Sequence, residues 1–196
     1  MKLVYSGKLG SFLVSAMLAS AVSLAAAGHE CASVSMADSA AGNASRQASD
    51  LVKVVERDAA QISNYADELQ MATTNSNISW EMHAADLTGI KEAINDMAVQ
   101  VCRLEAIRSA ASPWEQRVID TTAPEVRLMA DNAGDAIHFL NGHHEELWRD
   151  AYRKYLDNLY QEANQISQSI HDNVRYAKAH QQEELLGSKL GIKKSS

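Results

Sequence analysis

Apolar residues recur along most of the chain at the spacing of helices. The clearest run covers residues 87–104, and its apolar positions are Leu87, Ile90, Ile94, Met97, Val101 and Leu104. Steps that alternate between three and four residues keep side chains on one face of a helix, and they are the heptad pattern of helices that pack side by side. This run therefore predicts a helix with one buried stripe.

Three other segments have the same periodicity. In residues 44–73 the apolar stripe contains Leu51, Val55, Ile62, Tyr65 and Leu69, widened by Val52, Val54 and Ala59. In residues 112–140 it contains Val118, Thr122, Val126, Met129, Ala133, Ile137 and Leu140. In residues 146–180 it contains Tyr152, Leu156, Leu159, Ala163, Ile166, Ile170, Val174 and Ala177. These patterns predict three more helices, each with one side in a core.

The start of the third helix has a specific local signal. Ser112 precedes Pro113, and Glu115 follows three residues after the serine. A serine and a glutamate at this spacing form a capping box, and proline is favoured at the first helical position because its missing N–H would have no partner there. Pro124 lies further along the same segment, and it predicts a kink in this helix or its division into two.

The other helix ends carry weaker signals. Ser79 is placed to cap the second helix. Asn141 and Gly142 tolerate the backbone conformation that ends a helix, so we expect the third helix to stop there, and the fourth to stop at Gly187. Trp148, at the start of the fourth helix, is expected to cover the end of the core.

The four segments have matched lengths of about 28 to 36 residues and short connections. Matched helices with short loops predict an all-α fold, an up-down-up-down four-helix bundle with coiled-coil-like heptad seams, over residues 44–182. Residues 183–196 are expected to be a frayed basic tail. A dimer of helical hairpins would have the same periodicity and is the alternative arrangement.

The N-terminus has the layout of a secretory signal peptide. Lys2 and Lys8 precede a 16-residue apolar run, residues 12–27, that ends in three alanines. This layout predicts cleavage after Ala27 and a flexible leader over residues 28–43. The protein is therefore expected to be exported, either to a periplasm or out of the cell.

Two other roles for the N-terminus are less well supported. An uncleaved membrane anchor would need about 20 apolar residues, and no other segment of the chain is apolar for long enough to span a bilayer after cleavage. A lipoprotein modified at Cys31 would need small or apolar residues before the cysteine, where Gly28, His29 and Glu30 stand.

Removal of residues 1–27 leaves 16 basic and 25 acidic residues, a net charge of −9. Nucleic acids and anionic membranes bind basic surfaces, so this balance argues against both as partners. The two cysteines, Cys31 and Cys102, are in a chain expected to reach an oxidising compartment. They are candidates for one disulfide that would tie the leader to the bundle, and two unpaired thiols or an intermolecular link are the alternatives. A reversible bond would make the chain a redox-responsive module.

The bundle topology brings four of the seven histidines to one end, near Trp80, Trp148 and Tyr152. These histidines, His83, His138, His143 and His144, are the only candidate ligands for a transition metal such as zinc, copper or nickel. No two of them are three or four residues apart, as two ligands on one helix face would be. Histidines and tryptophans that simply close the bundle end are the alternative.

The sequence contains no catalytic motif: it lacks a nucleophile elbow, a glycine-rich phosphate loop and a CxxCH haem attachment site. We therefore expect an exported, non-enzymatic helical bundle that binds a partner protein or an envelope component, with a homodimer as one arrangement and no resident cofactor. The alternative function is metal binding or metal buffering by the histidines at the bundle end.

Overall fold

The computed structural model describes residues 41–75 and 78–191. Its four long helices are α1 (Ala41–Ala72), α2 (Trp80–Ile107), α3 (Pro113–Gly142) and α4 (Asp150–Leu190), and a single 3₁₀ turn, η1 (Arg108–Ala110), follows α2. Within these residues there is no strand. The prediction of an all-α fold is confirmed.

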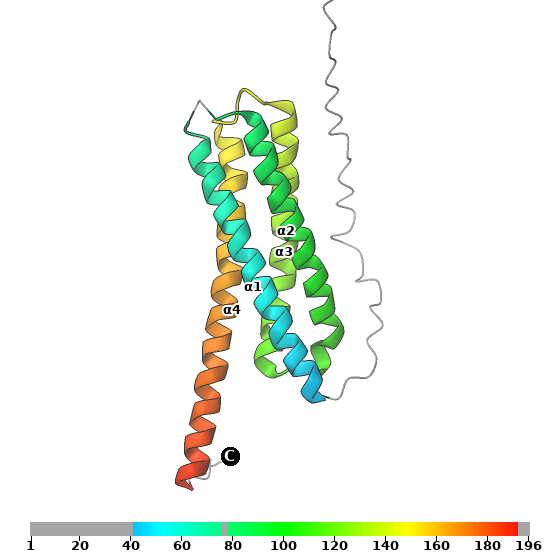
Figure 1. Cartoon of the computed structure of the whole chain (residues 1–196), viewed down its shortest axis with the longest axis vertical. Coiled ribbons are helices and arrows are strands. Elements are labelled where there is room, and N and C mark those ends of the chain that lie inside the picture. The colour runs from blue at the N-terminus through cyan, green and yellow to red at the C-terminus, as the bar shows by residue number, and fades with distance from the viewer. Residues whose placement is uncertain (1–40, 76–77, 192–196) are drawn as a thin grey trace, which may run out of the picture.

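Each helix runs antiparallel to the next, and the loops are short (Figure 1). Neighbouring helices pack in the order α1, α2, α3, α4 and back to α1, whereas the backbones of helices on the diagonals come close at few points or none. This arrangement is consistent with the predicted four-helix bundle. The heptad geometry of the seams and a kink at Pro124 stay predictions. The structure does contradict a division at Pro124, because α3 is continuous from Pro113 to Gly142.

The α2 stripe is buried as predicted, whereas the predicted α1 stripe is buried only in part. All six residues of the predicted α2 stripe, from Leu87 to Leu104, are buried. On α1 the buried apolar residues are Ala44, Ala48, Val52, Val55, Ala59, Ile62, Ala66, Leu69 and Ala72. The predicted seam residues Leu51 and Tyr65 are only half-buried. Five of the nine buried apolar residues on α1 are thus alanines, and small side chains let neighbouring helices approach more closely.

Tyr65 of α1 packs tightly against Gly89 of α2. A Cβ atom at this position would lie 3.2 Å from the ring of Tyr65. The tyrosine ring therefore lies against the backbone of α2, at the edge of the core rather than inside it. On α3, Ala136 is fully buried and the predicted Ile137 is half-buried.

The connection from α3 to α4 differs from the prediction in two ways. The helix α4 begins at Asp150 and not near Glu146, because two hydrogen-bonded turns intervene: the N–H of Glu146 donates to the His143 carbonyl at 2.9 Å, and that of Arg149 to the Glu146 carbonyl at 3.0 Å. These turns bury Leu147 and leave Trp148 65% exposed. Leu147 covers the core here, and the prediction for Trp148 is wrong.

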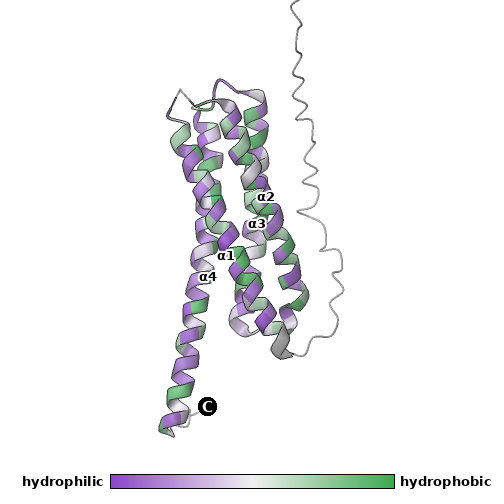
Figure 2. Ribbon diagram, in the orientation of Figure 1, coloured by the Kyte–Doolittle hydropathy of each residue, from purple (hydrophilic) through white to green (hydrophobic). Residues whose placement is uncertain are grey.

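The helix α4 also ends later than predicted. It continues through Gly187 to Leu190, and Gly191, with φ of 67°, ends it in the left-handed conformation. A glycine inside a helix costs only about 1 kcal/mol, so Gly187 does not stop it. Residues 183–190 are therefore helical. This extension is mostly hydrophilic, with apolar residues among the hydrophilic ones (Figure 2). The signal peptide, nearly all of the leader and residues 192–196 lie outside the described residues.

Candidate functional site

His83 and Tyr152 join α2 to α4 at one end of the bundle. Both side chains are buried, and His83 Nδ1 lies 3.1 Å from the Tyr152 hydroxyl oxygen. Burial lowers the pKa of His83, because the charged imidazolium would lose its hydration. Burial, together with the nearby carboxylate of Asp86, raises the pKa of Tyr152. The structure therefore favours a neutral imidazole and a neutral phenol.

Two loop histidines stack on aromatic side chains at the same end. The His144 ring lies on Trp80 with a centroid separation of 4.3 Å and an interplanar angle of 9°. The His143 ring lies on Phe139 at 4.4 Å and 21°, and its Nδ1 is 3.1 Å from the Phe139 carbonyl oxygen. Phe139 in turn stacks on Tyr152 at 5.7 Å. We call these residues, with His83, the aromatic end.

The four histidines predicted as metal ligands thus have different environments. His83 is buried, His143 and His144 are exposed and stacked, and His138 is exposed on α3. Within residues 41–75 and 78–191, no three His, Cys, Asp or Glu side chains form a group that could hold a metal ion. The ring stacks of the aromatic end pack the α3–α4 connection against the start of α2 and the end of α3, and they pack Phe139 against Tyr152 of α4.

A buried carboxylate fixes the opposite end. Glu115, at the start of α3, is buried, and its Oε2 accepts hydrogen bonds from the Ser112 N–H and hydroxyl, both at 2.7 Å, and from the Ser45 hydroxyl at 3.0 Å. The capping box predicted for Ser112 and Glu115 is present. No sequence signal predicted the contact from Ser45, which ties α1 to the start of α3.

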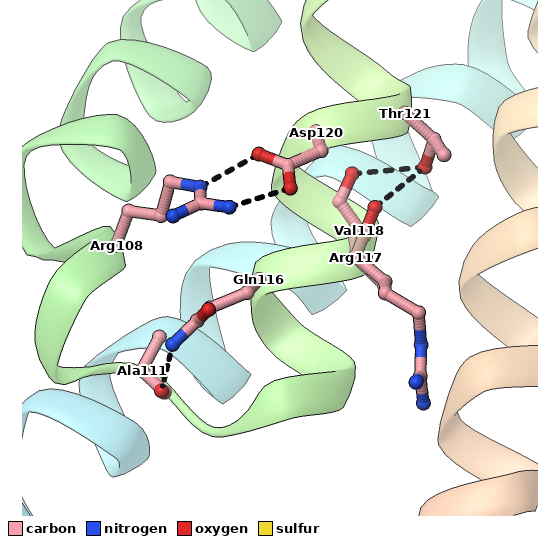
Figure 3. A network of polar contacts seen from close by, with 7 residues as sticks. All are labelled: Arg108, Ala111, Gln116, Arg117, Val118, Asp120 and Thr121. Carbon is pink, nitrogen blue, oxygen red and sulfur yellow. Dashed lines mark hydrogen bonds and ion pairs between the residues drawn. The ribbon is translucent and has the colours of Figure 1, made fainter.

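Polar contacts on the surface stabilise the connection between α2 and α3 at the same end of the bundle (Figure 3). Arg108, in η1, donates from Nε and from one terminal nitrogen to the two oxygens of Asp120 on α3, each at 2.6 Å. Gln116 donates to the Ala111 carbonyl at 2.9 Å. The α2–α3 connection is thereby held against the first turns of α3.

A second carboxylate lies between α3 and α4. Asn132 donates at 2.7 Å to Glu162 Oε1 and accepts from Asn158 at 2.9 Å. Burial raises the pKa of Glu162 to about 7 despite the bond from Asn132, and the carboxylates of Glu125 and Asp131 add to the rise. This side chain will change its charge near neutral pH.

An open groove lies at the Glu115 end, beside the extension of α4. Its volume is about 820 Å³, and we call it the α4 groove. From α1 it is lined by Ser49, Val52, Lys53 and Glu56, and from the start of α3 by Ser112, Pro113, Trp114 and Arg117. From α4 it is lined by Val174, Tyr176, Ala177, Lys178, His180, Gln181 and Glu184.

Arg117 joins two walls of the α4 groove. Its guanidinium carbon lies 5.3 Å from the centre of the Tyr176 ring, and its Nε donates to Asn173 at 3.4 Å. Figure 3 shows this side chain reaching from α3 toward α4. The contact is a cation–π interaction at an exposed site, which contributes about 0.5–1 kcal/mol.

Beyond this contact α4 leaves the bundle. It has 41 residues against 30 in α3, and it extends past the ends of the other helices (Figure 1). Three leucines on the extension are exposed: Leu185 at 56%, Leu186 at 57% and Leu190 at 70%. Sequence reasoning missed this surface because it ended the helix at Gly187 and treated residues 183–196 as a frayed tail.

Only one of the two cysteines, Cys102, lies in the described part of the chain. Cys102 is half-buried on α2, and Cys31 lies outside the described residues, so the bond stays a prediction. In the described part of the chain, every helix is too short or too polar to cross a membrane. Comparison of the chain with protein-family models, curated proteins and solved structures gives no match.

Proposed function

We propose that this chain is an exported, non-enzymatic helical-bundle protein that acts by binding a protein through the α4 groove. The observation that carries the proposal is that α4 continues beyond the bundle with exposed leucines and forms one wall of an open groove. A soluble helix that has no partner is normally polar on its free faces. A protein partner would cover these leucines.

The shape of the groove favours a helical ligand. Its three walls are helices, and apolar side chains, among them Val52, Trp114 and Val174, line it together with charged ones. An amphipathic helix binds such a groove by inserting apolar residues three or four positions apart, while its charges pair with those at the rim. Lys178 and Glu56 are available for such pairs.

Export is part of the proposal and rests on residues 1–27. A charged start, an apolar run of 16 residues and the three alanines before Gly28 support it. Production of the full chain in a bacterial host should yield an exported protein whose N-terminal residue is Gly28, as determined by mass spectrometry. A cytoplasmic protein that retains Met1 would contradict this part of the proposal.

Site-specific photo-crosslinking in the native host tests the binding function. A benzophenone amino acid replaces Gln181, which is exposed and lines the α4 groove. Leu128, which is exposed on α3 and lies outside the groove, is the matched control position. We expect a discrete protein adduct from position 181 and none from position 128.

The adduct supports the proposal only together with affinity measurements. The crosslinked protein is identified, purified and titrated against the mature chain. We expect Leu185→Lys to raise the dissociation constant at least tenfold, an order-of-magnitude loss of affinity for an apolar anchor residue. Equal adducts from both positions, no adduct at all, or an affinity unchanged by Leu185→Lys would each contradict a binding role for the groove.

A further inference from the structure

The buried stripe of α4 continues beyond the bundle on the same side of the helix. Within the bundle it contains Leu156, Leu159, Ala163, Ile166 and Ile170. After Ile170, steps of four, four, three and four residues lead to Val174, Lys178, Gln181 and Leu185. These residues share one face, because positions three and four apart are neighbours on a helix. Val174 still packs against the core, whereas Lys178, Gln181 and Leu185 further along the same face are exposed within the described residues.

This face carries opposite charges placed symmetrically about Gln181. Lys178 lies three residues before it and Glu184 three residues after it, and all three side chains line the α4 groove. Ala177 and Leu185 lie four residues before and after it. When two identical helices pack antiparallel about a two-fold axis at Gln181, Lys178 of each copy lies opposite Glu184 of the other. The small Ala177 lies opposite the large Leu185.

We infer that the occupant of the α4 groove is a second copy of this chain, packed antiparallel along residues 174–188 of α4. The two-fold axis makes the contact self-complementary, since each contact occurs twice. The tip of each extension, with Leu185, enters the groove of the other copy beside Val52 and Trp114. The inference rests on the proposed function and names its partner.

The charges of the two side chains favour an intermolecular pair. Among the described residues, Lys178 makes no ion pair, and Glu184 lies 3.5 Å from His180, which carries charge only when protonated. Lys178 and Glu184 are six positions apart, so they are not neighbours that could pair within one helix. A second copy supplies each with an opposite charge, and it also covers Leu185.

A charge-swap experiment tests the arrangement in the mature chain, residues 28–196. Molar mass is measured by sedimentation equilibrium between about 1 and 100 µM, a range that brackets weak to moderate dimers. Lys178→Glu places two pairs of like charges in the interface, and Glu184→Lys does the same with the opposite sign. The double variant restores two attractive pairs. Arg175→Glu, an exposed change on the same helix outside the groove lining, is the control.

We expect a dimer for the unaltered chain and for Arg175→Glu. Each single variant should have a dimer dissociation constant at least tenfold higher, and the double variant should return to within about threefold of the unaltered chain. A change that only perturbs the helix would not be rescued. An unaltered chain that is monomeric throughout, single variants that dimerise normally, or a double variant without rescue would overturn the inference. In that case the crosslinking at Gln181 still decides the proposed function, because a different protein would then be the adduct.

Discussion

The hydroxyl oxygen of Tyr152 lies 3.1 Å from Nδ1 of His83, and this contact between two buried side chains joins the starts of α2 and α4. The two residues are 69 positions apart in sequence. The contact makes His83 an internal hydrogen-bonding residue of the aromatic end. It also makes the stability of that end depend on pH.

We expect acid to destabilise the protein through His83. Burial lowers the pKa of this side chain, so its contribution to stability is complete above the unfolded-state pKa of about 6.5 and is lost as the pH falls below it. The measurement is urea unfolding between about pH 7.5 and pH 5, a range that brackets this value. His83→Gln should reduce the slope of stability against pH in this range.

Tyr152→Phe is the matched control for that slope. It removes the hydroxyl but keeps the titrating histidine, so the pH dependence should persist. The free energy of unfolding should fall by about 1–3 kcal/mol at neutral pH, because a buried hydrogen-bonding group loses its partner. An identical pH slope in His83→Gln and in the unaltered chain would exclude His83 as the source.

Glu162 should affect the pH dependence of stability in the opposite direction to His83, lowering stability as the pH rises. Its pKa is raised from 4.5 to about 7, so its favourable contribution is complete below about pH 4.5 and is lost as the pH rises through 7. Glu162→Gln keeps a hydrogen-bonding side chain without the charge. Above neutral pH it should be more stable than the unaltered chain by about 1 kcal/mol, a figure reduced for solvent screening at this half-exposed site. Asp157→Asn, at an exposed position of α4, should not change the pH profile.

Removal of the buried carboxylate of Glu115 should be the most damaging of these changes. It accepts three hydrogen bonds from Ser45 and Ser112, and Glu115→Ala leaves those donors unpaired beside a cavity. We expect a loss of about 2–4 kcal/mol in the free energy of unfolding. Ser45→Ala removes only the link to α1 and should cost about 1 kcal/mol. Equal losses in the two variants would mean that the capping box contributes little.

The fold was largely predictable because its signals are local and repeated. The heptad spacing from Leu87 to Leu104 and the capping box at Ser112 each depend on residues close in sequence, and the structure contains both the buried stripe and the cap. The buried alanines of α1 other than Ala59 were missed, because a single methyl group adds little to a pattern of apolar residues. Their burial depends on how closely α1 and α2 approach.

The candidate site was less predictable for the same reason. The aromatic end was anticipated from topology, but the partners of each histidine depend on loop conformation. The two turns after His143 determine that Leu147 is buried and that Trp148 is exposed. The α4 groove depends on where α4 ends. Gly187 and Gly191 are both glycines that could end a helix, so the sequence does not distinguish between them. Only Gly191 has a positive φ.

Metal binding by His83, His138, His143 and His144 is the alternative function, and it has its own test. Because His143 and His144 stack on Phe139 and Trp80, we expect zinc or copper to leave the melting temperature of tag-free protein unchanged. His144→Ala should instead cost about 0.5–1.5 kcal/mol through loss of the stack on Trp80. His171→Ala, at an exposed position of α4, is the control and should change little. Stoichiometric metal that is lost in His144→Ala would support the alternative.

Hydrogen–deuterium exchange along α4 tests the central claim most directly. The backbone of residues 174–190 lies on a helix with few buried contacts, so at low protein concentration its amides should exchange much faster than those of residues 156–170. When the concentration rises from about 1 to 100 µM, across the range of weak to moderate dimers, we expect residues 174–188 to become protected and residues 156–170 to stay unchanged. Exchange of residues 174–188 that is equally fast at both concentrations would contradict the claim that a second copy covers this surface.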